Sequence, residues 1–264
     1  MRFRTQKYGY GAVVPFFLIH AGALLTVVVP ASLWMLVMSY AVRMFGVTGG
    51  YHRYFSHRSY KLGRVAQLVL AVIAQSSGQK GVLWWAALHR VHHRHSDDEA
   101  DIHSPARRGF WWSHAGWVLS NEHDSYDSKD IADFGKFPEL RWLDRHHWVP
   151  TTGLAMLCLV FGGWTGLVWG YLAPTVLVYH CTFAINSVAH IFGTRRFETA
   201  DHSRNNWLLA IVTFGEGWHN NHHFSMASAR QGYSWWEIDI TYGVLKVLSW
   251  MRIARDLRPF RGMA

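Results

Sequence analysis

The chain has 264 residues, of which 50% are hydrophobic, 16% aromatic and only 16% charged, whereas about a quarter of an average soluble protein is charged. Its net charge is +9, yet residues 8–42 and 146–194 contain no Lys, Arg, Asp or Glu. A nucleic-acid-binding domain does not leave two such uncharged blocks, so we expect no nucleic acid partner. The two cysteines, Cys158 and Cys181, lie in apolar stretches without a C-x-x-C motif, which argues against a disulfide framework and a thiolate metal site.

The first uncharged block predicts a helical hairpin. It is too long for one membrane span of about 20 residues, and Pro30-Ala31-Ser32 offers a turn. We therefore expect spans at approximately 9–29 and 31–50. The basic N-terminus followed by an apolar run also resembles a signal peptide, but this run is long for such a leader and a second apolar stretch follows at once.

The second uncharged block predicts another hairpin, broken near Gly162–Gly166, with spans at approximately 148–168 and 172–193. Four spans keep all three basic segments on one side, as the positive-inside rule requires. Two spans would put the histidines of 219–223 across the membrane from those of 52–57. We therefore predict a single all-α integral membrane domain, residues 1–264, with four transmembrane helices in two hairpins and both termini in the cytoplasm.

The remaining residues, 53–145 and 195–264, are expected to form a cytoplasmic helical cap. Residues 65–74 are apolar but too short to span a bilayer, which suits a buried or re-entrant helix. Residues 121–129 are polar and predict a loop. Residues 234–251 mix tryptophans with scattered charges and predict a helix lying in the membrane interface beside anionic lipid.

Histidine is unusually frequent, with 18 copies, and eight of these form short patterns. His89, His92 and His93 are spaced i, i+3, i+4, which places them on one helical face. His219, His222 and His223 repeat that spacing. His52 and His57 are five residues apart, about 140° on an α-helix, so they need not face the same ion. A lone histidine is usually a surface residue, but this clustering predicts a polyhistidine metal site.

A further candidate pair lies near the end of the predicted fourth span, where Asn186 precedes His190 by one helical turn. Polar side chains at membrane depth are costly without partners, so both indicate a site at the cytoplasmic mouth of the bundle. An interhelical hydrogen bond is the alternative.

Nine imidazoles suggest two metal ions, since zinc sites usually take three or four protein ligands. Di-iron carboxylate bundles use paired Glu-x-x-His motifs, but Glu216-x-x-His219 is the one copy here. The zincin motif H-E-x-x-H is absent. A haem-binding electron-transfer membrane protein, with His20 and His180 as axial ligands, remains an alternative of another class, although it would leave the histidine clusters unused.

Several motifs in order resemble the membrane fatty acyl desaturases of the stearoyl-CoA desaturase (delta-9) family, as a bacterial-type member. They are H-R-Y-F-S-H-R, H-R-V-H-H-R, R-R-G-F-W-W-S-H-A-G-W, N-S-V-A-H and G-E-G-W-H-N-N-H-H, between Met38 and Tyr233. The resemblance implies two iron ions (Fe²⁺), with Asn186 holding a metal-bound water. The nine ligands that it implies are His52, His57, His89, His92, His93, His190, His219, His222 and His223.

The same resemblance implies an enzyme that uses dioxygen and two electrons to place a cis double bond, delta-9-like, in a saturated acyl chain. It implies no catalytic residue beyond the metal site. Trp85 and Thr182 would shape the bend of a substrate tunnel at the irons, and Tyr40 would lie near its closed end. Ordinary packing within the bundle is the alternative for these three residues. A related hydroxylase, acetylenase or terminal-alkene-forming enzyme is the alternative reaction.

The chain departs from the animal acyl-CoA enzymes where those carry cations for CoA. Ala87-Leu88 and Asn121-Glu122 stand at those places and cannot make charge-assisted bonds to phosphates. Arg107 and Arg108 remain. The acyl chain is therefore carried on CoA or on a membrane phospholipid, and both stay open. Electrons must come from a separate donor protein, a haem, ferredoxin or similar carrier with its reductase. We expect an integral protein of the bacterial inner membrane.

Overall fold

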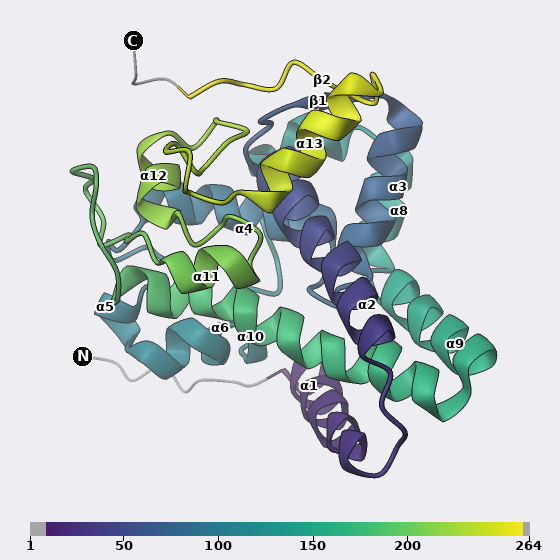
Figure 1. Ribbon diagram of the computed structural model, residues 1–264. Helices are drawn as coiled ribbons and strands as arrows, with labels where there is room; N and C mark the ends of the chain where they lie inside the picture. The colour runs from purple at the N-terminus through teal and green to yellow at the C-terminus, as the bar shows by residue number, and fades with distance from the viewer. Residues whose placement is uncertain (1–8, 261–264) are drawn as a thin grey trace.

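The computed structural model describes residues 9–260, and these are almost entirely helical (Figure 1). The charged segment 1–7 and the last four residues lie outside the described residues, and with them the chain ends that were predicted to be cytoplasmic. The helices of the N-terminal half are α1 (Tyr10–Ala23), η1 (Leu24–Val27), α2 (Leu33–Phe45), η2 (Gly46–Ser56), α3 (Arg64–Gln75), α4 (Val82–His95), α5 (Pro105–Arg108), η3 (Trp112–Gly116), α6 (Trp117–Leu119) and η4 (Ser128–Ile131).

The C-terminal half continues in the same way, and two very short strands join the ends of the cap. Its helices are α7 (Ala132–Gly135), α8 (Pro138–Arg145), α9 (Trp148–Thr165), η5 (Gly166–Leu172), α10 (Ala173–Ser187), η6 (Val188–His190), α11 (Trp207–Val212), α12 (His219–Phe224) and α13 (Ile240–Trp250). Strands β1 (Lys61–Leu62) and β2 (Ala254–Arg255) pair antiparallel, with Lys61 opposite Arg255.

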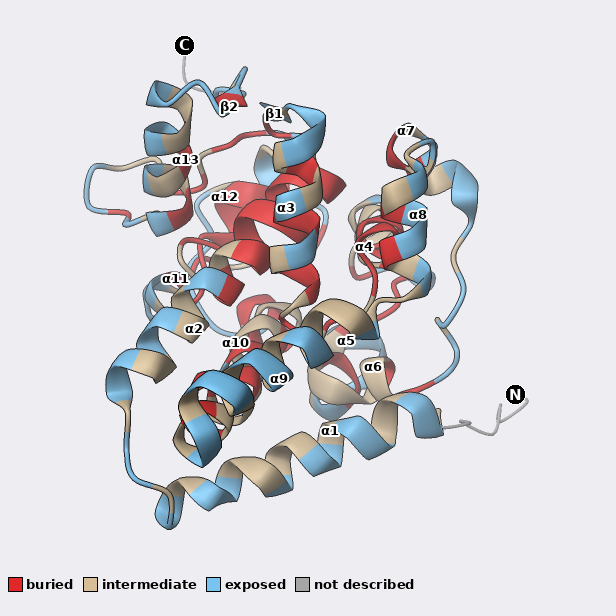
Figure 2. Ribbon diagram, turned by 90° about the vertical axis from the view of Figure 1, so that its right-hand side faces the viewer, coloured by how far each residue is buried: buried red, intermediate tan, exposed pale blue. Residues whose placement is uncertain are grey.

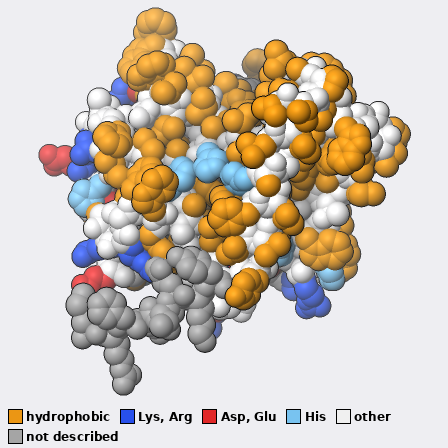
Figure 3. All heavy atoms as spheres, turned by 90° about the horizontal axis from the view of Figure 1, so that it is seen from below, with side chains coloured by type: hydrophobic (Ala, Val, Ile, Leu, Met, Phe, Trp, Pro, Cys, Tyr) orange, Lys and Arg blue, Asp and Glu red, His pale blue; other side chains and the backbone are white. Residues whose placement is uncertain are grey.

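Four helical segments, α1, α2, α9 and α10, project from the rest of the protein toward one side (Figure 1). No residue of α1 or α9 is buried, and many of their apolar residues are exposed (Figure 2). Phe17 is 59% exposed and Phe161 83%. The surface on the side of α1 is dominated by hydrophobic side chains (Figure 3). A surface of this kind suits contact with lipid rather than water.

Two stretches of the described chain are long and apolar enough to cross a membrane, Tyr10–Val27 and Trp148–His190. The prediction of four transmembrane helices is therefore not confirmed. The helix at the second predicted span is α2, which has 13 residues before it continues into a buried segment around Arg53. That apolar part is shorter than the roughly 20 residues of a full crossing.

The chain reverses direction at Gly163, inside the stretch Trp148–His190, which has 43 residues. Gly163 has φ 56° and ψ −149°, in the half of backbone space that favours glycine. Beyond the turn the backbone returns so closely that a Cβ on Gly166 would lie 2.1 Å from the Cys158 carbonyl oxygen. The reversal lies within the predicted break at 162–166, whereas the predicted span limits at 168 and 172 fall inside η5.

The cap is built around η2, α3 and α4, and it contains the deepest core. Fully buried apolar side chains there include Phe55, Leu83, Ile131 and Leu140. Helix α3 buries Leu70, Ala71 and Ala74 but exposes Val65 and Val69. The helix predicted for 234–251 begins only at Ile240, and Trp235 before it is 93% exposed. Figure 2 shows that α4 and α12 carry the buried residues at the centre of the cap.

Candidate metal centre

The first histidine pair is brought together by an unusual helix. Residues Gly46–Ser56 form a π-helix that is buried throughout, and the His57 N–H donates to the His52 carbonyl at 3.1 Å. Because π-helical hydrogen bonds join residues five apart, side chains at this spacing lie nearly above one another. The His52 and His57 rings are 4.7 Å apart. The separation of about 140° assumed an α-helix, and the change of helix type removes it.

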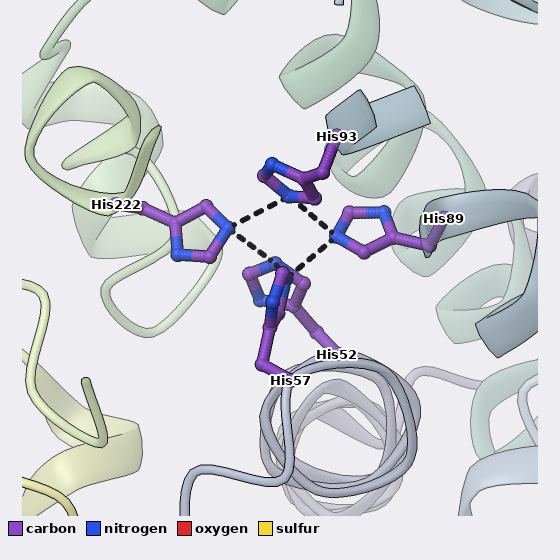
Figure 4. Close-up of side chains that lie close together, drawn as sticks. All are labelled: His52, His57, His89, His93 and His222. Atoms are coloured by element: carbon purple, nitrogen blue, oxygen red, sulfur yellow. Dashed lines mark hydrogen bonds between the residues drawn. The ribbon is translucent and has the colours of Figure 1, made fainter. Parts of the chain in front are cut away.

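Five histidines from three helices turn their Nε2 atoms toward one point (Figure 4). Neighbouring Nε2 atoms are 2.9–3.1 Å apart around the ring. All five lie within 4.8 Å of one another. We call this set the first cluster; it consists of His52, His57, His89, His93 and His222.

Four further histidines, all buried, form a second cluster whose ligand atoms also lie within 4.8 Å of one another. It consists of His92, His190, His219 and His223. The Nε2 atoms of His190 and His219 are 3.0 Å apart. Consecutive residues of α4, His92 and His93, serve different clusters because adjacent side chains on a helix point about 100° apart. His222 and His223 of α12 do the same, so all nine predicted ligands are brought into two adjacent groups.

Four of these rings have a carboxylate beside their Nδ1 atom. Nδ1 of His52 is 2.6 Å from Glu216, and Nδ1 of His223 is 2.7 Å from Asp201. Nδ1 of His190 is 2.9 Å from Asp97, and Nδ1 of His92 is 3.0 Å from Asp101. A carboxylate on Nδ1 keeps the proton there and leaves the Nε2 lone pair for a metal. The aspartates had not been identified from the sequence, although the acidic run S-D-D-E-A-D at 96–101 directly follows the second motif, and Glu216 had been noted only for its Glu-x-x-His spacing.

The electrostatics of both clusters favour neutral imidazoles. Burial and neighbouring imidazoles hold the pKa of His57, His89 and His93 well below its usual value near 6.5, and the same causes act on His219 and His222. Burial lowers the pKa of His223 to about 4, although Asp201 acts against this shift. Burial alone would raise the pKa of Asp97, Asp101 and Asp201, but their hydrogen bonds and ion pairs with histidine lower it. Neutral imidazole is the form that binds metal.

Imidazole nitrogens in both clusters lack a suitable hydrogen-bond partner, which favours a bound cation in each. Each Nε2 of the first cluster faces two others, but a ring nitrogen can donate at most one hydrogen. In the second cluster, the buried Nε2 of His223 has no hydrogen-bond partner among the described residues. Buried polar atoms normally have a partner. A positive ion in each cluster would satisfy these lone pairs, and an all-imidazole donor set suits iron, zinc or copper.

A cavity of about 750 Å³ reaches the first cluster at His89. Of the predicted substrate residues, Trp85 and Thr182 line it, as does Asn186. Trp85 stacks on His89 with ring centres 4.8 Å apart, and Thr182 accepts a hydrogen bond from the Gln79 amide at 3.0 Å. This is an apolar space that ends against imidazoles, suited to an extended hydrocarbon.

Tyr40 lies away from this cavity. Its hydroxyl donates to the Val212 carbonyl, and its ring packs against Phe214 with centres 6.0 Å apart. It is not among the residues that line the cavity, so its place at a closed tunnel end stays a prediction. The same holds for the water predicted on Asn186, whose backbone carbonyl accepts a hydrogen bond from Ser113 at 2.7 Å.

The haem alternative does not fit the structure. Its two candidate ligands, His20 and His180, are in direct contact, with their Nε2 atoms 3.0 Å apart. Axial ligands bind haem iron from opposite faces of the porphyrin, and this distance leaves no room for the ring between them.

The chain was compared with known proteins. The family model for fatty acid desaturase matches residues 11–247. An sn-1 stearoyl-lipid 9-desaturase from Anabaena variabilis is 36% identical over 254 residues, which is 92% of this chain and 92% of the relative. One from Synechocystis sp. is 39% identical over 217 residues, 81% of this chain and 67% of the relative. An acyl-CoA 5-desaturase from Anemone leveillei is 37% identical over 232 residues, 86% of this chain and 72% of the relative.

The family model covers the helices that carry both histidine clusters. The described structure is mostly helical and contains two histidine groups that can hold metal ions. The chain belongs to the fatty acid desaturase family, and the prediction of an oxidoreductase that acts on acyl chains is confirmed.

Proposed function

We propose that the protein is a di-iron, dioxygen-dependent desaturase that places a cis double bond, delta-9-like, in a saturated acyl chain of a membrane phospholipid. The observation that carries this proposal is the meeting of nine imidazoles, in two clusters, with an apolar cavity. Two iron ions would supply the oxidising power there, together with dioxygen and two electrons. The relatives that are named as 9-desaturases support the position of the double bond.

The protein's own residues bind and orient the chain. The first cluster would hold one iron and the second cluster the other, with Asn186 bound through water. Trp85 and Thr182 flank the cavity beside His89 and would set the bend of the chain. Each methylene that enters the cavity contributes about 0.8 kcal/mol, so the shape of the cavity, rather than a polar contact, fixes which carbons face the clusters.

The charges at the polar end of the cavity favour a lipid over acyl-CoA. Lys80 lines this end, but its ammonium is 2.7 Å from the Asp124 carboxylate, and Asp144 also lines the wall. The guanidinium of Arg107 donates to the Asp97 carbonyl, and Arg108 pairs with Glu122 at 2.8 Å. Paired cations and extra carboxylates do not recognise the phosphates of CoA.

The membrane arrangement that supports this function has four spans, formed by α1, α2, α9 and α10. Both termini and the cap would lie in the cytoplasm, and the membrane would be the bacterial inner membrane. Electrons would arrive from a separate carrier, a ferredoxin or haem protein with its reductase, that docks on basic residues of the cap.

Turnover by the purified, iron-loaded protein tests the proposal. Vesicles of stearoyl phospholipid and, separately, stearoyl-CoA are supplied with a reducing system, and the products are read by mass spectrometry for double-bond position. We expect a monounsaturated chain in the phospholipid and little reaction of the CoA ester. Hydroxylated, acetylenic or terminal-alkene products would support the alternative reaction. No oxidation of either substrate, in protein that contains two irons, would refute the proposal.

A further inference from the structure

Helix α1 forms one wall of the cavity and has nothing behind it. Gly11, Ala12, Pro15, Phe16 and Ile19 line the cavity, yet none of the residues of α1 is buried. Figures 1 and 2 both show α1 at the edge of the molecule, and its inner side contacts α10. The cavity is therefore separated from the lipid-facing surface by a single helix.

Both ends of α1 contact the rest of the protein, whereas its middle lacks one backbone hydrogen bond. At the start, the Gly9 N–H donates to the Leu119 carbonyl at 3.0 Å. Near the other end, Gly22 packs against Leu172, whose Cδ1 would be 3.0 Å from an added Cβ. Between them, Pro15 has no N–H to donate, so the carbonyl of Gly11 lacks its helical partner. Such a break in the hydrogen-bond ladder is a common cause of a kink.

A chain of imidazoles closes the seam between α1 and α10. The Nε2 atoms of His20 and His180 are 3.0 Å apart, and Nδ1 of His180 is 3.0 Å from Nε2 of His114 in the cap. The chain continues to Ser187, 2.9 Å from Nδ1 of His114. Imidazole side chains are visible in the middle of the apolar face in Figure 3. Polar contacts on a lipid-facing surface are costly to break without a replacement partner, so this chain holds the seam closed.

A phospholipid acyl chain cannot reach this cavity through water without exposing all of its methylenes. We propose that α1 is a lateral gate, latched by the contact between His20 and His180, that moves away from α10 to admit the acyl chain directly from the bilayer. This inference rests on the proposed phospholipid substrate. It assigns a function to three histidines, His20, His114 and His180, that neither cluster uses.

Locking α1 to α10 tests the gate. The variant His20→Cys/His180→Cys is made in a Cys158→Ala/Cys181→Ala background, loaded with iron and joined by a bifunctional thiosulfonate that spans the two positions. We expect turnover of stearoyl phospholipid vesicles to fall about tenfold or more when α1 is locked, and to return when a reductant removes the linker. Bound iron should remain unchanged throughout. Enzyme that is locked after lipid has entered should complete one turnover and then stop.

A second lock leaves both histidines in place. Phe16→Cys/Tyr179→Cys replaces two stacked rings, whose centres are 6.1 Å apart, in the middle of α1 and on α10. Joined by the same linker, this variant should show the same reversible loss. The matched control joins Lys61→Cys to Asp256→Cys, an exposed ion pair 2.7 Å long between β1 and the residue that follows β2, and should turn over at the parent rate. A locked enzyme that works at the rate of its reduced form overturns the gate. An unlocked parent that forms no double bond overturns the proposed function instead.

Discussion

The two histidine clusters differ in the charge that surrounds them. Three carboxylates, those of Asp97, Asp101 and Asp201, contact rings of the second cluster, and their other partners are hydroxyls, backbone amides and further imidazoles. In the first cluster a single carboxylate, that of Glu216, contacts a ring, and Arg53 pairs with it at 3.0 Å. The second cluster is therefore the more negative environment.

The clusters also differ in what they face. His89 of the first cluster lines the cavity, whereas none of the four histidines of the second cluster does. Carboxylates behind metal-binding imidazoles increase ligand basicity and affinity. We therefore expect the second cluster to bind its ion more tightly and to stabilise its higher oxidation state. The first cluster would leave its ion more electron-deficient, on the side where the acyl chain lies.

The largest expected effect comes from removing one ligand of each cluster. We predict that His92→Ala and His222→Ala each abolish turnover while the protein still inserts in the membrane, because a vacancy in either group disrupts the paired site. Iron analysis should show loss from the altered cluster first. His95→Ala, on the same helix α4 with its ring bonded to Asp98, is the matched control. Full activity in either ligand variant would contradict its assignment.

The next effect comes from neutralising a carboxylate of the second cluster. We predict that Asp97→Asn lowers the affinity of one of the two bound metal ions about 10–100-fold, because the amide no longer supplies negative charge behind His190. Competition between the protein and a chelator for Co²⁺ measures this affinity. Asp98→Asn, one residue away and exposed, should leave both affinities unchanged. If the two variants behave alike, the charge around the second cluster has no role in binding.

A smaller effect is expected from the matching change at the first cluster. Arg53 already neutralises much of the Glu216 charge, and it keeps Asp239 as a partner at 2.9 Å. Glu216→Gln should therefore weaken metal binding by less than Asp97→Asn does, measured in the same chelator competition. If Glu216→Gln weakens metal binding more than Asp97→Asn does, the first cluster depends more on its carboxylate than the second cluster does.

The smallest effect concerns the metal-free protein. His223 is neutral when folded, and its folded pKa of about 4 lies below the usual 6.5. The lowered pKa therefore makes the free energy of unfolding depend on pH. The contribution of His223 to this free energy is complete above pH 6.5 and is lost as the pH falls toward 4, and it amounts to on the order of 3 kcal/mol. Thermal unfolding of chelator-treated protein between pH 7.5 and 5 should show a falling Tm. In a His223→Gln variant, Tm should depend less on pH. A pH profile of Tm identical to that of the parent would show that His223 does not cause the loss of stability.

The i, i+3, i+4 spacing was sufficient to find six of the nine histidines, because it puts side chains on one helical face whatever the surroundings. His52 and His57 were found as a third histidine motif, and His190 by its position at membrane depth with Asn186. The sequence was not sufficient for their carboxylate partners, since Asp201 reaches His223 only after a loop returns to α12. It also did not place Tyr40, whose contact with Val212 joins residues far apart in the chain. Membrane spans were harder still, because α2 is short and the chain turns back at Gly163, inside α9, without a polar loop.

Because Gly46–Ser56 is a π-helix, the metal centre depends on the number of residues between His52 and His57 as well as on their identity. Substitutions along it change packing, but they leave His52 and His57 five residues apart. Removing one residue between them would shorten the spacing to four, which an α-helical turn still keeps on one face, as it does for His89 and His93. Adding one residue would widen the spacing to six, about 120° apart on an α-helix, so the two rings could no longer approach the same ion. Such insertions, which are tolerated in surface loops, should be strongly selected against in this segment.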